Sequence, residues 1–322
     1  MTFVTAASTL AAFLGSALER IDGALDAWLP RPPLCPPLLS EAMRYSLLAG
    51  GKRLRPLLTL AAADAVARKV TSGTPQALAA AAEAALPAAC AIEFLHTYSL
   101  IHDDLPAMEN DALRRGRPTA HVVYGDGLAI LAGDGLQAAA FDLLAREPVT
   151  SDPVVIQRQL RVLALVAGAA GPAGMVGGQA IDLQAAGQVP QRTLPLDRDG
   201  LREMHARKTG ALIRAAAGAG AILAGGTTQL VMAVDRYAAD LGLAFQIVDD
   251  ILDVEGDGAT LGKTVGKDAA DAKPTYPALY SLERSRALAS DCIARCRATL
   301  EEAALTDGWL WPIATSVVDR RR

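Results

Sequence analysis

Two long apolar helical patterns in this chain each end in a cluster of carboxylates. The first cluster contains Asp103 and Glu109, and the second contains Asp249 and Asp253. Positions i and i+4 of a helix lie on one face, about 6 Å apart, so Asp249 and Asp253 can reach one cation together. Asp103 and Glu109 can do so if the chain turns after Pro106. Oxygen ligands of this kind suit Mg²⁺, which binds a few carboxylates together with substrate phosphates. Two solvated acidic helix ends are the simpler alternative.

The composition favours helices along the whole chain. The 322 residues are 51% hydrophobic but only 4% aromatic, and the abundant alanine and leucine are good helix formers. The length leaves room for more than one domain, yet all-helical enzymes reach this size. We find no strand pattern, internal repeat or linker, and we therefore expect one all-α domain over residues 1–322.

Hydrophobic spacing, prolines and glycines divide the chain into helices. We expect residues 76–106 to be two helices that meet near Pro87, and residues 152–184 to be one helix with a kink at Gly171 and Pro172. The other expected helices cover residues 5–28, 38–48, 56–70, 126–146, 198–224, 228–253, 276–305 and 309–319.

Charge and cysteine usage exclude several classes of protein. The net charge is −4, and no run of Lys or Arg is long enough to indicate nucleic-acid binding. Residues 162–181 and 215–234 carry no charge, and their Ala and Gly content indicates close-packed core helices rather than membrane spans. The N-terminus lacks the basic start of a signal peptide, and the four cysteines lack the spacing of a zinc site. We therefore expect a cytoplasmic protein without a membrane span.

Residues 50–56 can bind an anion. Gly50 and Gly51 free the backbone, and Lys52, Arg53 and Arg55 follow within four positions. Such a segment can wrap an anionic group. Two glycines at a helix end with cations beside them are also a common cap, and the segment alone leaves both interpretations open.

Further cations lie close to the first acidic cluster. Arg114 and Arg115 follow it directly, and because adjacent side chains point in different directions, this loop can serve two separate anions. His96 lies about two helical turns before Asp103, on the same face of the helix. We therefore expect His96 to contact an anion, and we expect His102 to be structural.

Glycines mark two further places of interest. The glycine-rich residues 255–273 follow the second acidic cluster and carry Lys263, Lys267 and Lys273, which indicates a mobile flap over an anionic substrate. The pair Gly177–Gly178 lies inside an expected helix, where each glycine costs about 1 kcal/mol. We therefore expect another backbone segment or a ligand to approach closely there.

In this order, the segments resemble those of the short-chain trans-isoprenyl diphosphate synthases. The motifs that carry the resemblance are residues 50–56, Asp103–Asp104–x4–Glu109, residues 114–116, Gln246–x2–Asp249–Asp250–x2–Asp253 and the loop of Lys263. The four-residue gap in the first motif is similar to that of the bacterial farnesyl diphosphate synthases. The resemblance implies an all-α isoprenoid synthase fold around a central cavity, usually in a homodimer, with three Mg²⁺ ions. It also implies condensation of isopentenyl diphosphate with dimethylallyl or geranyl diphosphate.

The resemblance further implies roles for single residues. The implied isopentenyl diphosphate site consists of Lys52, Arg55, His96 and Arg115. The implied contacts of the allylic diphosphate are Arg114, Lys208, Thr209, Gln246, Lys263 and Lys273. The implied magnesium ligands are Asp103, Glu109, Asp249 and Asp253. The residues expected to matter most for turnover are Asp103, Asp249, Lys208 and Lys263.

Two positions depart from the family pattern. Glu109 and Ala112 stand where the family usually has aspartate. Glu109 keeps the charge but adds a methylene, which changes the reach of one metal ligand. Ala112 removes a nearby acid whose direct role is less clear.

The position of Tyr98 predicts the product length. Tyr98 lies five residues before Asp103, about 7.5 Å along a continuous helix. A diphosphate held at the aspartates would send its growing tail along this helix, where a bulky ring can act as a floor and Ser99 beside it is small. The resemblance agrees, because an aromatic residue here is similar to the farnesyl-producing members. We expect a C15 product, with C20 as the alternative, and Tyr98 as a packing residue remains open.

The chemistry of prenyl transfer agrees with these residues. An allylic diphosphate ionises when cations neutralise its leaving group, and the carbocation then needs an apolar chamber without water. A class I terpene cyclase shares this step but would not need Lys52, Arg55 and His96, and its usual second motif is absent. A non-catalytic partner subunit is the other alternative; Glu109 and Ala112 point weakly toward it, and the intact second motif argues against it.

Overall fold

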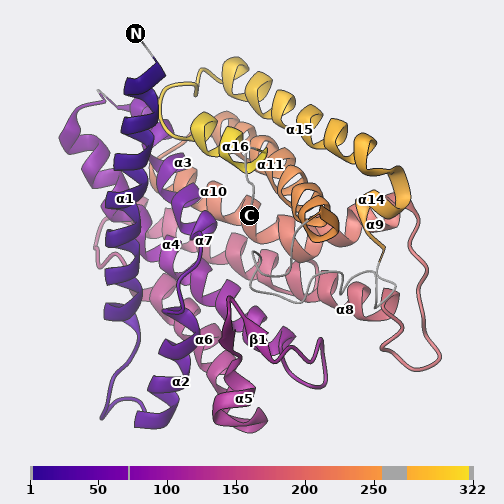
Figure 1. Cartoon of the computed structure of the whole chain (residues 1–322). Coiled ribbons are helices and arrows are strands. Elements are labelled where there is room, and N and C mark those ends of the chain that lie inside the picture. Colours follow the sequence, from indigo (N-terminus) through magenta and orange to yellow (C-terminus); the bar gives the residue numbers. More distant parts are fainter. Residues whose placement is uncertain (1–2, 72, 256–273, 319–322) are drawn as a thin grey trace.

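The all-α architecture is confirmed. The computed structural model describes residues 3–71, 73–255 and 274–318, and these residues form a bundle of helices (Figure 1). The helices of the first half are α1 (Phe3–Trp28), α2 (Pro37–Leu47), α3 (Leu54–Val70), α4 (Pro75–Asp103), α5 (Ala120–Tyr124) and α6 (Asp126–Arg146). Those of the second half are α7 (Pro153–Ala170), α8 (Met175–Ala185), α9 (Arg198–His205), the π-helix η1 (Ala206–Gly210), α10 (Ala211–Leu223), α11 (Thr228–Glu255), α14 (Tyr276–Tyr280), α15 (Leu282–Glu302) and α16 (Leu310–Val318).

Helix α10 occupies the centre of the bundle. It packs against α3, α4, α7 and α11, and nearly all its residues are buried. Its alanines and glycines let these neighbours approach closely, since a Cβ atom at Gly220 would lie only 2.0 Å from the carbonyl oxygen of Thr59. A helix that is apolar on all sides belongs in a core, so the prediction from the uncharged residues 215–234 is confirmed for this helix.

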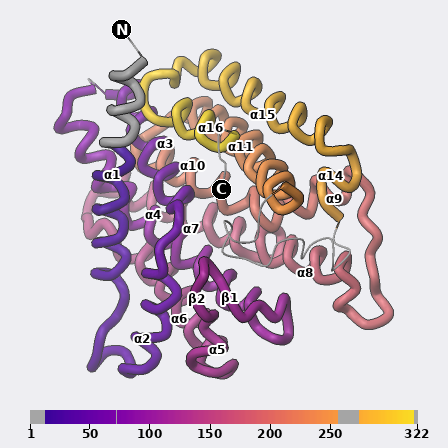
Figure 2. Tube along the Cα trace, viewed as in Figure 1, coloured from indigo at the N-terminus to yellow at the C-terminus, as the bar shows by residue number. Residues whose placement is uncertain are grey.

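The outer layer encloses this core from several sides. Figure 2 shows α1 along one side and α15 across another, with α10 and α11 between them. Helix α7 also belongs to the outer layer, where it buries one stripe, formed by Val162, Val166 and Ala170. The prediction that residues 162–181 form a core helix is therefore wrong for much of the stretch, because an uncharged Ala/Gly sequence can also lie half-exposed.

The predicted helix break at Pro87 is wrong. Helix α4 runs without interruption from Pro75 to Asp103. An interior proline costs roughly 3 kcal/mol, but residues 85–95 around it are buried throughout, and their packing against the neighbouring helices outweighs this cost. The continuous helix holds His96 and Asp103 in a fixed phase, as the prediction from their spacing requires.

Three other predicted helices are interrupted. Residues 152–184 form two helices, because the chain breaks completely at residues 171–174. Residues 276–305 divide at Ser281, whose φ of 92° ends one helix and whose hydroxyl caps the next by accepting a hydrogen bond from the Arg284 N–H at 3.3 Å. The π-turn η1 interrupts residues 198–224.

A two-residue hairpin corrects the expectation that the chain has no strands. Strands β1 (Leu113–Arg114) and β2 (Arg117–Pro118) pair antiparallel. The two residues between them, Arg115 and Gly116, both have positive φ, 54° and 73°, as a tight hairpin turn requires. Strands this short leave no alternating pattern in the sequence.

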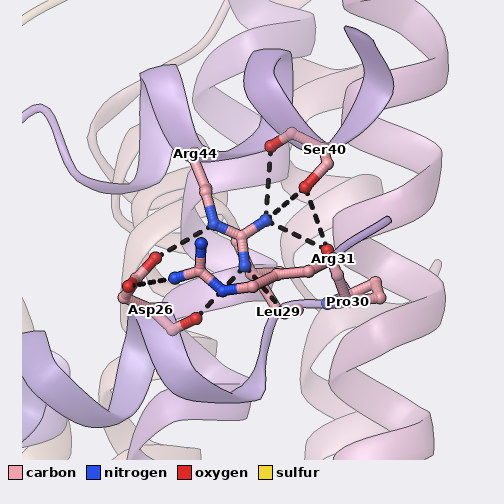
Figure 3. A network of polar contacts seen from close by, with 6 residues as sticks. All are labelled: Asp26, Leu29, Pro30, Arg31, Ser40 and Arg44. Atoms are coloured by element: carbon pink, nitrogen blue, oxygen red, sulfur yellow. Dashed lines mark hydrogen bonds and ion pairs between the residues drawn. The ribbon is translucent and has the colours of Figure 1, made fainter. Parts of the chain in front are cut away.

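The corner between α1 and α2 is fixed by Arg44 (Figure 3). Its guanidinium donates hydrogen bonds to the Asp26 carboxylate at 2.9 Å and to the carbonyl oxygens of Leu29 and Pro30 at 2.7 and 3.0 Å. The carbonyl groups at the end of α1 are thereby satisfied. The corner positions α2, which leads directly into residues 50–56.

Candidate active site

One open cavity of about 610 Å³ brings most of the predicted site residues together. It lies among residues of α3, α4, α8, η1 and α11. The predicted residues that line it are Lys52, Arg55, His96, Asp103, Glu109, Arg114, Arg115, Lys208, Thr209, Gln246, Asp249 and Asp253. Lys263 and Lys273, which were predicted to belong to the same site, lie outside the described residues.

The first acidic cluster is formed by a tight turn after α4. The Glu109 N–H donates to the Asp103 carbonyl oxygen at 2.8 Å, so the chain folds back as the sequence required for the two acids to meet. The adjacent Asp104 points elsewhere, because it is buried and accepts hydrogen bonds from the Arg114 guanidinium at 2.6 and 2.9 Å. Asp104 thus anchors the hairpin arginine, while Asp103 and Glu109 line the cavity.

Lys208 is the cation beside this acidic cluster. Its Nζ lies 2.6 Å from Oδ2 of Asp182 and 3.5 Å from Oε1 of Glu109. Burial alone would lower the pKa of Lys208, but Asp182, Asp103 and Glu109 outweigh burial and raise that pKa. Lys208 therefore stays charged, ready to neutralise an anion in the cavity.

The position of Lys208 depends on a close helix contact. It belongs to η1, and π-turns of this kind are frequent at functional sites. A Cβ atom at Gly178 of α8 would lie 2.2 Å from the Lys208 backbone nitrogen. The predicted close approach at the Gly177–Gly178 pair is confirmed, and the approaching segment is the backbone that carries Lys208.

The electrostatics of the acidic cluster fit the binding of a cation. Burial raises the pKa of Asp103 to about 6, and Glu109 and Asp104 add to the shift, whereas Lys208 and Arg114 oppose it. In the part of the chain that the structure describes, no three His, Cys, Asp or Glu side chains lie close enough to hold a metal ion by themselves. Carboxylate ligands completed by substrate phosphate oxygens are the arrangement that Mg²⁺ prefers.

A basic wall also lines the cavity. Arg55 is buried, and burial lowers its pKa, although Glu93 and Asp249 oppose the shift. Burial, and then the charge of Arg55 and Arg115, lowers the pKa of His96 well below its ordinary value. His96 is therefore a neutral hydrogen-bonding group at pH 7, and an anion would bring the charge that this wall lacks.

Arg53 has a different environment from its two cationic neighbours. Its side chain is almost fully buried and lies 2.9 Å from both Glu93 and Asp22, and it donates to the Leu47 carbonyl oxygen at 2.8 Å. Its φ of 48° lies in the left-handed region. Arg53 therefore fixes residues 50–56 to α1 and α4 through buried ion pairs.

The second acidic cluster lies on α11, where Asp249 and Asp253 line the cavity. One helical turn earlier, Oε1 of Gln246 accepts a hydrogen bond from the Thr209 hydroxyl at 3.0 Å. The structure thus joins α11 to η1 at the residues that were predicted to contact the allylic diphosphate.

Tyr98 and Ser99 lie beside the cavity rather than in its wall. Tyr98 is buried and packs edge-on against His102, with ring centroids 5.7 Å apart. Ser99 donates to the His96 carbonyl oxygen at 2.9 Å. His102 lies 3.1 Å from the Ile130 carbonyl oxygen and so connects α4 to α6, as expected of a structural histidine.

Comparison with known proteins assigns the chain to a family. Residues 36–304 match the model of the polyprenyl synthetase family. The chain belongs to this family. It is 45% identical over 270 residues to a farnesyl diphosphate synthase of Geobacillus stearothermophilus, covering 84% of each chain. It is 44% identical over 278 residues to a geranylgeranyl diphosphate synthase of Cyanophora paradoxa, covering 86% of this chain and 85% of the relative.

The fold leads to the same family. A geranyltransferase structure from Helicobacter pylori, in complex with magnesium and isoprenyl diphosphate, superposes with a TM-score of 0.79 at 30% identity, covering 96% of both chains. The chain thus has the fold of the isoprenyl diphosphate synthases, and it is a prenyltransferase of the trans-prenyl diphosphate synthase type. The relatives differ in product length, which the comparisons therefore leave open.

Several polar residues of the polyprenyl synthetase site are missing from the sequence prediction. They are Glu93, Asp182, His205 and Asp250, which line the cavity beside the predicted set. Asp182 leaves a signal in the sequence, because it is the first charged residue after the uncharged residues 162–181. His205 is a neutral group like His96, since burial lowers its pKa to about 4.

The contact at Gly178 leads to a prediction for this prenyltransferase. Gly178→Ala should lower kcat about 100-fold and reduce Tm by several degrees, because overpacking against a backbone costs about 1–3 kcal/mol and displaces Lys208. Gly168→Ala is the control, since Gly168 is exposed on α7 with nothing within 4 Å of its Cβ position. Steady-state kinetics and calorimetry should show the loss in the first variant alone; wild-type values for Gly178→Ala would contradict the contact.

The raised pKa of Asp103 predicts a pH-dependent stability. Because the carboxyl has a higher pKa folded, about 6, than unfolded, about 4, its ionisation destabilises the fold above pH 6 and not below pH 4. Without metal, Asp103→Asn should raise Tm by about 2–4 °C at pH 8, and the gain should vanish at pH 4. Calorimetry in a chelator checks this, with Asp142→Asn on the exposed face of α6 as control. A difference that does not vary with pH would contradict the assignment.

Proposed function

We propose that the protein condenses isopentenyl diphosphate with dimethylallyl diphosphate and then with the resulting geranyl diphosphate, giving (2E,6E)-farnesyl diphosphate. The observation that carries the proposal is the cavity itself, in which two acidic clusters and two sets of cations line one space. The test is incubation of the purified protein with Mg²⁺ and radiolabelled isopentenyl diphosphate, with and without an allylic co-substrate. Product formation that requires all three supports the proposal, and incorporation without the allylic compound refutes it.

The two sets of cations supply separate diphosphate subsites. Lys52, Arg55, His96 and Arg115 form the proposed isopentenyl diphosphate site, whose cations are partly deprived of counter-charge, as the lowered pKa values of Arg55 and Arg115 indicate. The proposed allylic site consists of Arg114, Lys208, Thr209 and Gln246, with Lys263 and Lys273 from beyond the described residues. The hydrogen bond between Thr209 and Gln246 supports a common function for these two side chains.

We propose that Asp103, Glu109, Asp249 and Asp253 hold Mg²⁺, with three ions in the complete site. The raised pKa of Asp103 and the oxygen-only ligand set fit a hard cation, and the Helicobacter pylori relative was crystallised with magnesium. Bound Mg²⁺ would neutralise the developing charge of the diphosphate leaving group. The longer Glu109 keeps the charge that this position needs.

The protein's own residues would orient, neutralise and exclude water. The Lys208 ammonium would stabilise the leaving diphosphate, because a fixed charge in a partly buried site needs no reorganisation during the reaction. The Ala- and Leu-rich helices around the cavity would protect the allylic cation from water. The double bond of isopentenyl diphosphate then attacks C1 of this cation, and the proton that it loses would pass to the released diphosphate.

We propose C15 as the product and keep C20 as the alternative, since a geranylgeranyl diphosphate synthase is among the relatives. The buried ring of Tyr98, five residues before Asp103 on the continuous α4, supports a floor for the tail. The intact second acidic motif and the complete basic wall argue against a non-catalytic partner subunit. Membership of the polyprenyl synthetase family favours prenyl transfer over terpene cyclisation.

We further propose that two copies associate through the outer faces of α6 and α7. Helix α4, helix α6 and the stretch Pro153–Ala185 are each long and apolar enough to cross a membrane by length and composition. The apolar window of α4 is 67% buried, whereas those of α6 and of Pro153–Ala185 are only 39% and 28% buried. A second copy that covers Leu131 and Leu160, 55% and 60% exposed, would remove this apolar surface from water; a monomeric mass in light scattering would contradict the proposal.

The separation of the subsites predicts selective kinetic effects. Arg55→Ala or Lys52→Ala should raise KM for isopentenyl diphosphate about 10-fold or more, because a charge-assisted hydrogen bond is lost, and should change KM for geranyl diphosphate much less. Lys69→Ala, at the exposed end of α3, is the matched control. Equal effects on both substrates would show that the subsites have been merged or exchanged.

The proposed floor predicts a change of product. Tyr98→Ala should shift the product from C15 to C20 or longer, with little loss of the first condensation, because the ring no longer blocks the tail. Tyr98→Phe is the control and should keep C15. Chromatography of the dephosphorylated products decides, and a Tyr98→Ala variant that still stops at C15 would make Tyr98 a packing residue.

A further inference from the structure

The second acidic motif contains one carboxylate whose surroundings differ from those of its neighbours. Asp250 is only 4% exposed, whereas Asp249 and Asp253 are intermediate. Its Oδ1 accepts a hydrogen bond from Nε2 of Gln246 at 2.8 Å, and its Oδ2 accepts one from the backbone N–H of Tyr276 at 2.9 Å. Each oxygen of this carboxylate therefore receives a donor from the protein itself.

The first of these hydrogen bonds determines how the Gln246 amide is oriented. An ionised carboxylate can only accept hydrogen bonds, so Gln246 has to turn its NH₂ group toward Asp250. The amide oxygen then lies on the other side, where it accepts the Thr209 hydroxyl at 3.0 Å. The amide nitrogen has a second N–H donor, and Gln246 lines the cavity.

We propose that Asp250 is a positioning residue of the allylic subsite, which fixes the Gln246 amide so that it presents a donor to a diphosphate and does not itself bind metal. Its action passes through Gln246 to Thr209, along one chain of hydrogen bonds. The inference rests on the proposed placement of the allylic diphosphate at these two residues.

The second hydrogen bond gives Asp250 a structural task that can be separated by mutation. Tyr276 begins α14, the first helix after residues 256–273, and its ring lies 5.7 Å from that of His205 in the cavity wall. Asp250→Ala removes both hydrogen bonds. Asp250→Asn keeps an oxygen for the Tyr276 N–H but turns an NH₂ group toward Gln246, where two donors now meet.

The test is a mutant cycle with both substrates. Asp250→Asn should raise KM for geranyl diphosphate about 10-fold, the loss expected for one hydrogen bond to a charged group. KM for isopentenyl diphosphate and the Mg²⁺ concentration for half-maximal activity should stay within about twofold of the wild type. Gln246→Ala should show the same selective effect, and the double variant should be no worse than Gln246→Ala alone, because Asp250 acts through Gln246.

Two results would overturn the inference. One is a double variant whose KM rises by the product of the single effects. The other is a Mg²⁺ requirement that shifts in Asp250→Asn as it does in Asp249→Asn, which would make Asp250 a metal ligand. Asp235→Asn is the control for loss of a carboxylate from the same helix, since Asp235 forms an exposed ion pair with Arg214.

A second variant keeps the test valid if Asp250→Asn does not fold. Thr209→Val removes the hydroxyl at the other end of the chain of hydrogen bonds; it should raise KM for geranyl diphosphate alone and add nothing to Gln246→Ala. Additive effects here would also overturn the inference. Turnover of geranyl diphosphate by the wild type tests the proposed function by itself, so the two failures can be distinguished. Calorimetric binding of inorganic pyrophosphate with Mg²⁺ measures the same variants without turnover.

Discussion

Charges that face a partly buried cavity need partners of opposite sign, and this requirement governs the site. On the acidic side, Asp103, Glu109 and Asp182 gather around Lys208, and burial still raises the pKa of Asp103 to about 6. On the basic side, burial lowers the pKa of Arg55, as its counter-charges only partly compensate. A cation for the first side and an anion for the second satisfy both, which is what a magnesium–diphosphate substrate would bring.

The fold makes this arrangement possible by close backbone approach. Gly178 lets α8 lie against the π-turn that carries Lys208, and Gly220 lets α10 lie against α3. Pro87 does not interrupt α4, so one rigid helix carries both His96 from the basic wall and Asp103 from the acidic cluster. Neighbouring polar residues of the same motif are then free to serve as anchors.

The sequence predicts the helices and most of the cavity wall, because helical periodicity and charged motifs are local signals. It does not show which of two adjacent residues faces the cavity. Asp103 and Asp104 look alike in the sequence, as do Lys52 and Arg53, yet Asp104 and Arg53 are buried in ion pairs. Those partners come from distant segments, so only the folded chain distinguishes them; the continuity of α4 likewise depends on tertiary packing.

The most direct test of this account is calorimetry of pyrophosphate and Mg²⁺ binding to the purified protein. The account predicts that Mg²⁺ alone binds weakly, because carboxylates need phosphate oxygens to complete its ligands, and that pyrophosphate binds at least tenfold more tightly when Mg²⁺ is present. Asp249→Ala should abolish this gain. Tight binding of Mg²⁺ without pyrophosphate, or pyrophosphate binding that is indifferent to Mg²⁺, would contradict the account.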